Sequence, residues 1–80
     1  MRAVFSKHSL LKLGQRNISE QKVIDAIRNP DYVFPSYGNR RVAYKKFGKL
    51  YLKVIFKREK DNTVVITQHW DETFKPPTNI

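Results

Sequence analysis

The sequence predicts an α+β fold in which two N-terminal helices pack on one face of a four-stranded antiparallel β-meander. Two observations support this class. Apolar residues recur at helical spacing before Pro30, whereas beyond it they alternate with polar residues at a period of two. The connections between the expected strands are short, and short connections require antiparallel pairing. A chain of 80 residues can bury one thin core, so a single domain is expected.

Polar caps mark the ends of both expected helices. Ser6 suits the N-cap of a first helix that runs toward Arg16, and Asn17 suits its left-handed terminator. Ser19 caps the second helix, and Asn29-Pro30 ends it because the residue before proline resists helical angles. The apolar stripe of the second helix consists of Val23, Ile24, Ala26 and Ile27.

Four strands are expected after Pro30, at residues 32–34, 40–47, 50–57 and 63–70. Pro35 confines the first of them to a sheet edge. Gly48-Lys49 forms a tight turn, and residues 59–62 form the next one. Residues 71–80, which include Pro76-Pro77, are expected to form a loose tail, so the domain is expected to span residues 5–70.

Alternation along the strands predicts one sheet face covered by the helices and one open face. The expected inward residues of the last two strands are Leu50, Leu52, Val54, Phe56, Val64, Ile66, Gln68 and Trp70. The open face then displays Lys53, Lys57, Thr67 and His69. The register of the strand 40–47 has two solutions. If Val42 points inward, the open face gains Arg41 and Lys45, whereas a slip by one residue replaces them with Arg40 and Lys46.

The charge is strongly positive and unevenly distributed. Sixteen Lys and Arg residues against seven Asp and Glu residues give a formal net charge of +9. No acidic residue occurs between Tyr32 and Arg58. An excess of this size favours a polyanionic partner, most often nucleic acid, although a basic surface without a ligand would have the same composition.

Two histidines and their basic neighbours suggest metal-independent cleavage of RNA. That reaction needs a base for the 2′-hydroxyl proton, an acid for the leaving 5′-oxygen and cations beside the phosphate. His8, Lys12 and Arg16 line one flank of the first helix, and His69 lies near the end of the last strand. The alternatives are a solvated helix flank and a histidine that packs beside Trp70. The carboxylates are scattered, so no metal site is expected, and no cofactor-binding loop is present.

Several classes of protein are excluded or disfavoured. The lack of cysteine excludes disulfide bonds and thiolate metal sites. No apolar run is long enough to span a membrane, and the N-terminal residues lack the hydrophobic stretch of a secretion signal. We therefore expect a cytoplasmic protein that does not contact membranes.

The opening segment resembles a known family. Ser6-Lys7-His8-Ser9, followed by Lys12-Leu13-Gly14-Gln15-Arg16-Asn17-Ile18-Ser19, is similar to the first motif of a small prokaryotic family, domain of unknown function family 4258. Glu20 to Asp31 resembles the second helix of that family, and Val64-Val65-Ile66-Thr67 resembles its closing strand. The likeness covers residues 5 to 70. Lys12 stands where the family has arginine, which keeps the charge but loses the bidentate fork.

This family is grouped with the RelE-like and BrnT-like ribonuclease toxins, which place one or two helices before an antiparallel sheet. The resemblance therefore implies a RelE-like fold, an activity like that of an mRNA interferase and an antitoxin partner that covers the basic face. The active-site set that it implies is His8, Arg16, Arg40 or Arg41, and Thr67.

The expected function is that of a toxin-type endoribonuclease that acts on RNA without a metal ion or cofactor. Its expected catalytic residues are His8, Arg16, Arg41, Thr67 and His69. Its expected RNA-binding residues are Lys12, Arg40, Lys45, Lys46, Lys53 and Lys57. The alternatives are a non-catalytic nucleic-acid-binding module that uses the same face, and a protein-interaction domain whose basic face docks an acidic partner.

Overall fold

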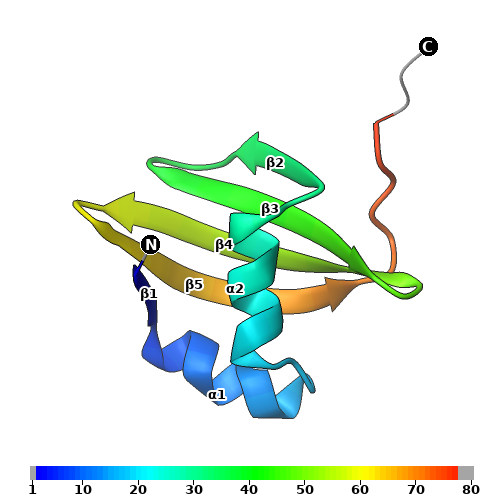
Figure 1. Ribbon diagram of the computed structural model, residues 1–80, viewed down its shortest axis with the longest axis horizontal. Coiled ribbons are helices and arrows are strands. Elements are labelled where there is room, and N and C mark those ends of the chain that lie inside the picture. The colour runs from blue at the N-terminus through cyan, green and yellow to red at the C-terminus, as the bar shows by residue number, and fades with distance from the viewer. Residues whose placement is uncertain (1, 78–80) are drawn as a thin grey trace.

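The computed structural model describes residues 2–77, which form two helices and one five-stranded sheet (Figure 1). The helices are α1 (Lys7–Gln15) and α2 (Glu20–Arg28). The strands are β1 (Arg2–Phe5), β2 (Tyr32–Pro35), β3 (Arg40–Phe47), β4 (Leu50–Glu59) and β5 (Asn62–Asp71). The predicted α+β class is confirmed.

The sheet is mixed and has one strand more than predicted. Its order is β1-β5-β4-β3-β2, and the strands from β2 to β5 pair antiparallel as expected. In addition, β1 pairs with β5 in parallel, with Arg2 opposite Asn62 and Phe5 opposite Val65. The prediction of a purely antiparallel four-stranded sheet is therefore wrong. A parallel pair needs a long crossover, and here all the elements between β1 and β5 supply it.

The predicted helix ends are confirmed. Ser6 Oγ accepts a hydrogen bond from the Ser9 backbone N–H at 3.1 Å, and Ser19 Oγ accepts one from the Lys22 N–H at 3.2 Å. Asn17 has a φ of 53°, in the left-handed region that ends helices. Each helix is only nine residues long, so packing against the sheet must stabilise it.

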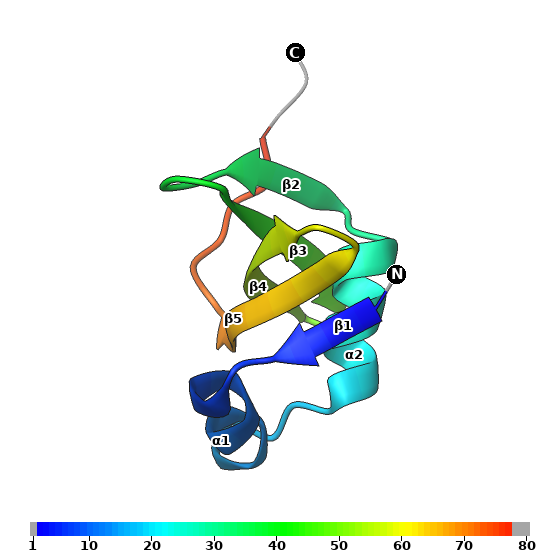
Figure 2. The same cartoon turned by 90° about the vertical axis from the view of Figure 1, so that its left-hand side faces the viewer.

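The two helices do not share one face of the sheet. α2 crosses β3 and β4 on one face, whereas α1 lies along β5 at the sheet edge (Figure 2). The buried core consists of Leu13, Ile18, Val23, Ala26, Ile27, Ala43, Leu52, Val54, Phe56 and Val65. Because α1 is at the edge, its side chains reach both the core and the face opposite α2, which we call the open face.

A β-bulge in β5 changes which residues face the core. Ile55 lies opposite Thr67 and Phe56 lies opposite Val65, so Ile66 is an extra residue in β5. As a result, Val65 is fully buried on the core side, and Thr67 lies on the open face. The expectation that Val64 and Ile66 point into the core is wrong, because strict alternation does not allow for the bulge.

Of the two registers considered for β3, the structure has the one that places Arg40 and Lys46 on the open face. Ala43 is fully buried and pairs with the fully buried Val54, so Ala43 faces α2. The residues of β3 on the open face are therefore Arg40, Val42, Tyr44 and Lys46. Those on the side of α2 are Arg41, Ala43, Lys45 and Phe47. The expectation that Arg41 and Lys45 face the open side is thus wrong.

The segment after β5 packs against the open face instead of forming a loose tail. β5 itself continues through Asp71, one residue past its expected end. Beyond it, the Phe74 ring stacks on the Tyr44 ring with centroids 3.7 Å apart and planes 12° apart. Figure 2 shows this segment on the side of the sheet opposite α2. Phe74 covers Tyr44, so Tyr44 is buried although it lies on the open face. For this reason its apolar character did not show that it faces the helices.

Prediction of core stability. Leu52 is fully buried between the sheet and α2, so Leu52→Ala removes apolar contacts and leaves a cavity. We expect the free energy of unfolding, measured with urea, to fall by about 2–5 kcal/mol. The matched control is Leu11→Ala, since Leu11 is 69% exposed on α1 and its loss should change stability by less than about 0.5 kcal/mol. Equal effects of the two substitutions would contradict the core described above.

Candidate functional site: a basic cluster where α1 meets β5

Arg16 joins the end of α1 to the open face of β5. Its Nη1 donates a hydrogen bond to the Gln68 carbonyl oxygen at 2.7 Å and another to Thr67 Oγ1 at 3.3 Å. Arg16 is also the C-cap residue of α1, so hydrogen bonds hold both its backbone and the guanidinium at the end of its side chain. The structure therefore brings together two of the residues that the sequence selected, Arg16 and Thr67.

The other end of α1 is anchored to the same strand. β1 covers β5 only as far as Val65, which leaves the outer edge of β5 free beyond that point. The Ser6 N–H donates to the Val65 carbonyl at 3.0 Å, and Ser6 Oγ donates to the Ile66 carbonyl at 3.1 Å. These bonds satisfy edge carbonyls of β5 with groups from the start of α1.

A buried polar pair fixes the middle of α1. The side chains of Ser9 and Gln68 are both fully buried. Ser9 Oγ donates to Gln68 Oε1, and Gln68 Nε2 donates to the Ser9 carbonyl at 2.9 Å. Because an unpaired buried amide would be costly, this reciprocal pairing allows only one placement of α1 along β5.

His69 lies on the open face beside Arg16 and Lys53. It follows Thr67 by two residues, and its partner across the sheet is Lys53 of β4. Burial lowers the pKa of the His69 imidazole, and the positive charges of Lys53 and Arg16 lower it further, against an opposing effect of the Asp71 carboxylate. The ring is therefore biased toward its neutral form, which can accept a proton.

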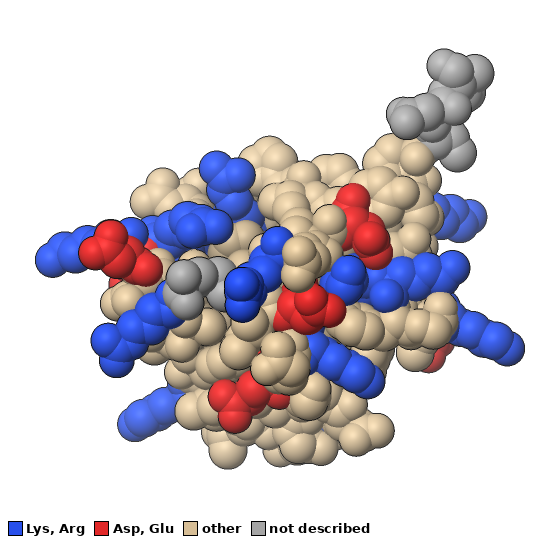
Figure 3. Space-filling view, viewed as in Figure 1, with Lys and Arg blue, Asp and Glu red and all other residues tan. Residues whose placement is uncertain are grey.

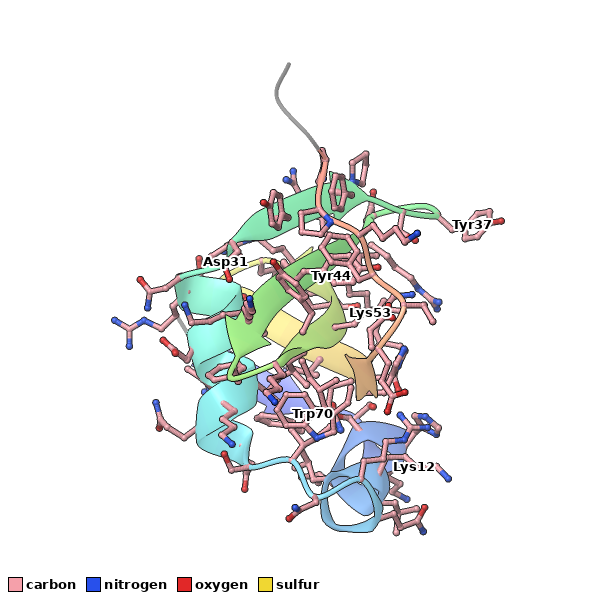
Figure 4. All side chains as sticks on the ribbon, turned by 90° about the vertical axis from the view of Figure 1, so that its right-hand side faces the viewer. Lys12, Asp31, Tyr37, Tyr44, Lys53 and Trp70 are labelled. Carbon is pink, nitrogen blue, oxygen red and sulfur yellow. The ribbon has the colours of Figure 1, made fainter. Side chains whose placement is uncertain are left out.

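His8 and Lys12 lie on the flank of α1 that leads to Arg16. Residues four positions apart on a helix lie one above the other, so the three side chains share one flank. His8 is exposed, and Lys12 Nζ donates to Gln15 Oε1 at 3.0 Å on the surface. Figure 4 shows Lys12 projecting from α1 on the side away from α2. We call Arg16, Thr67, His69 and Lys53 the basic cluster. The flank with His8 and Lys12 extends away from this cluster along α1.

The remaining predicted cations are more dispersed. Arg40 pairs across the sheet with Lys57, four residues along β4 from Lys53, which is about 13 Å at the rise of a strand. Lys57 Nζ forms an ion pair with Glu59 at 2.7 Å. Lys46 is on the open face, opposite Tyr51. The structure thus places these cations beyond the basic cluster, along the same face.

Two predicted site residues lie away from the basic cluster. Lys45 projects toward the end of α2, where its Nζ donates to the Asn29 carbonyl at 3.0 Å. Arg41 is exposed on the same side of β3 as Lys45. Figure 3 shows the face that carries α2, on which Asp and Glu side chains are interspersed with Lys and Arg. Neither residue shares a face with His69.

Within residues 2–77, no group of three or more His, Asp or Glu side chains is placed to hold a metal ion. No helix in the same range is long and apolar enough to cross a lipid bilayer.

The model of a protein family described as "Domain of unknown function (DUF4258)" matches residues 5–67. The chain belongs to this family. The matched segment includes His8, Arg16 and Thr67 and ends before His69. Comparison with curated proteins and with solved structures gives no match. The function of this DUF4258 domain therefore has to be argued from its own side chains.

Sequence reasoning did not anticipate two features of the open face of the DUF4258 domain. It took Phe74 as part of a tail, although aromatic residues at alternate positions of β2, Tyr32 and Phe34, indicate a surface that another ring covers. It placed Lys53 and His69 on the open face correctly, but not as direct cross-strand partners. Alternation along a strand predicts which face of the sheet a residue occupies. Its partner on the neighbouring strand depends in addition on the turn between the strands and on the bulge.

Prediction of pH dependence. Because the pKa of His69 is lower in the folded DUF4258 domain than its ordinary 6.5, the unfolded chain binds this proton more readily. The contribution of His69 to stability is therefore complete above about pH 6.5 and declines as the pH falls below it. We expect the urea midpoint of the wild type to drop more between about pH 7 and about pH 5 than that of His69→Gln.

The matched control for this measurement is Lys60→Gln, which removes a charge in the turn between β4 and β5, away from His69. Its pH dependence should equal that of the wild type. An unchanged slope in His69→Gln would show that the basic cluster does not disfavour protonation of His69.

Proposed function

We propose that this DUF4258 domain binds single-stranded RNA on its open face and cleaves it without a metal ion, as a toxin-type endoribonuclease. The observation that carries the proposal is the contact of Arg16 with Thr67 beside His69 and Lys53. A neutral imidazole beside two cations, one of them held by hydrogen bonds, supports general-base attack on a phosphodiester.

His69 is the proposed base. Its imidazole takes the proton of a 2′-hydroxyl group, whose oxygen attacks the adjacent phosphorus. The bond between phosphorus and the 5′-oxygen breaks, so the products carry a 2′,3′-cyclic phosphate and a 5′-hydroxyl. His8 is the proposed acid for the leaving 5′-oxygen, because it lies on the flank of α1 that ends in Arg16.

Arg16 and Lys53 are the proposed stabilisers of the charge that builds on the phosphoryl oxygens. Arg16 already donates to Thr67 Oγ1 and to the Gln68 carbonyl through Nη1. A guanidinium carries five N–H donors, so others remain for the phosphate. Since α1 holds Arg16 in place before RNA binds, little reorganisation accompanies the reaction.

The rest of the open face supports binding of an extended strand. Three more cations lie along it: Arg40, Lys46 and Lys57. Together with the net charge of +9, they favour a partner whose negative charges are spaced along a chain. Lys12 adds one charge from α1 and completes the proposed RNA contacts.

An acidic protein partner is part of the proposal. The resemblance to RelE-like and BrnT-like toxins implies an antitoxin, and the excess of positive charge supports an acidic one. Leu10 and Leu11, which are 50% and 69% exposed on α1, offer apolar contact beside the charges.

A second candidate function is non-catalytic binding of nucleic acid. The observation that favours it is the exposure of His8, whose imidazole makes no hydrogen bond with any side chain or backbone group of residues 2–77. A binding module needs the cations of the open face but no second proton carrier. Intact RNA after tight binding would decide for this candidate.

Prediction of cleavage. Purified protein incubated with single-stranded RNA and EDTA should give fragments that end in a 2′,3′-cyclic phosphate. His69→Gln should lower the rate by about 10²- to 10⁴-fold, because the base is lost. Lys60→Gln is the matched control, since it removes a charge in the turn between β4 and β5, away from the basic cluster. Equal rates for wild type and His69→Gln would remove His69 from the proposed mechanism.

Prediction of binding. The dissociation constant for a fluorescent RNA oligonucleotide, measured by anisotropy, should rise steeply with salt, because binding releases counterions from the phosphates. Lys53→Gln should weaken binding and reduce the slope of log affinity against log salt by about 1. Lys45→Gln removes the same charge on the side of α2 and should have a smaller effect. If both variants weaken binding equally, the RNA does not lie on the open face.

A further inference from the structure

We propose that Tyr44 is the stacking site for an RNA base next to the cleaved phosphate, and that Phe74 occupies this site in the free protein. The proposal rests on the proposed function, because it assigns one part of the same open face to a nucleobase. It makes the C-terminal segment a competitor of RNA.

The Phe74 ring occupies a position that suits a nucleobase. It stacks face to face on Tyr44, with centroids 3.7 Å apart and planes 12° apart. This spacing and this near-parallel arrangement are also those that a nucleobase adopts on an aromatic side chain. Around the ring, Tyr51 and Tyr32 make tilted or edge contacts at 4.9 and 5.7 Å, and Phe34 lies at 6.3 Å. Aromatic walls thus surround a slot that fits one planar ring.

The aromatic slot lies next to the basic cluster. Tyr44, Lys53 and His69 lie opposite one another on β3, β4 and β5. Neighbouring strands are about 4.8 Å apart, so Tyr44 is about 5 Å from Lys53 and about 10 Å from His69 at the backbone. A phosphate held between Lys53 and Arg16 therefore places an adjacent base over Tyr44. Figure 4 shows Tyr44 and Lys53 side by side under the C-terminal segment.

Phe74 is held locally and weakly. Asp71 Oδ1 accepts hydrogen bonds from Thr73 N–H, Thr73 Oγ1 and Phe74 N–H, at 2.8, 2.9 and 2.9 Å. In the described part of the segment, residues 72–77, every hydrogen bond goes to Asp71 and none to β2, β3 or β4. Asp71 thus ties the segment to the end of β5, while ring contacts alone hold Phe74 against β2, β3 and β4, and a base makes the same kind of contact.

The chemistry of the slot favours a base over an aromatic side chain of a protein partner. The rings alone would accept either, but the slot is adjacent to Lys53 and to Lys46 opposite Tyr51. A nucleobase of RNA fits both the aromatic slot and the lysines beside it, because its strand carries a phosphate on each side of the nucleoside. Since stacking reads no hydrogen-bond pattern, the site should accept all four bases.

The test compares wild type with Phe74→Ala in binding to two labelled oligonucleotides, a single-stranded RNA and an abasic strand of equal length and charge. If Phe74 occupies the slot in about nine of ten molecules, Phe74→Ala should bind the RNA about tenfold more tightly. Affinity for the abasic strand should be unchanged, because that strand has no base to stack. Adding Tyr44→Leu to Phe74→Ala should weaken RNA binding by about tenfold or more.

A second pair of variants tests the same release without altering the slot. Asp71→Ala removes the acceptor that holds Thr73 and Phe74, whereas Glu72→Ala removes an equal charge and none of these hydrogen bonds. Because the Asp71 carboxylate also acts on His69 and Lys53, the abasic strand measures the effect of its charge alone. Asp71→Ala should tighten binding of the RNA more than binding of the abasic strand, whereas Glu72→Ala should not. Thermal unfolding followed by circular dichroism confirms that each variant is folded.

The outcomes separate this inference from the proposed function. If wild type binds RNA and Phe74→Ala binds it equally well, the slot is not a base site, while the RNA-binding face stands. If Phe74→Ala gains affinity equally for the abasic strand, release of the segment exposes charge and not a stacking surface, and the inference is wrong. If no variant binds RNA, the proposed function fails and the inference fails with it.

Discussion

The bulge at Ile66 determines which side chains meet at the edge of this sheet. In a regular strand, Thr67 would lie on the same side as Val65 and point into the core. The extra residue reverses this assignment, so that Val65 packs in the core while Thr67 and His69 lie on the open face. It also returns Gln68 to the covered side, where Ser9 pairs with it. One irregularity thus gives α1 its anchor and gives the basic cluster its members.

Arg16 has a structural role in this arrangement, and the proposed function gives it a second one. Its bond to the Gln68 carbonyl satisfies the free edge of β5 and would hold α1 even in a protein without a ligand. Its weaker contact with Thr67 turns the guanidinium toward the open face, where Lys53 and His69 lie. Glu20 and Asp25 belong to α2 on the opposite side, whereas the Asp71 carboxylate acts on both His69 and Lys53. The positive charge of the open face is therefore partly offset by Asp71, and also by Glu59, which pairs with Lys57.

The sequence predicted the features that depend on neighbours along the chain. Ser6 and Ser19 begin helices through bonds to residues three positions later, and Asn17 ends one through its own left-handed backbone, so their roles can be recognised locally. The strand 40–47 has its predicted bounds because a period of two needs no knowledge of partners. The parallel pairing of β1 and the placement of Phe74 were not predictable in this way. Both depend on contacts with residues about 30 to 60 positions away, which local patterns do not encode.

The pairing of β1 with β5 also constrains when the domain can fold. β1 has no partner until Asn62 to Val65 have been synthesised. The start of α1 depends on the same strand, because Ser6 is bonded to a residue 60 positions later. Such distant pairings slow folding, because the intervening chain must close before any contact is gained. A nascent chain that stops short of β5 lacks both acceptors of Arg16 and also lacks His69. The open face is therefore complete only after β5 has been synthesised.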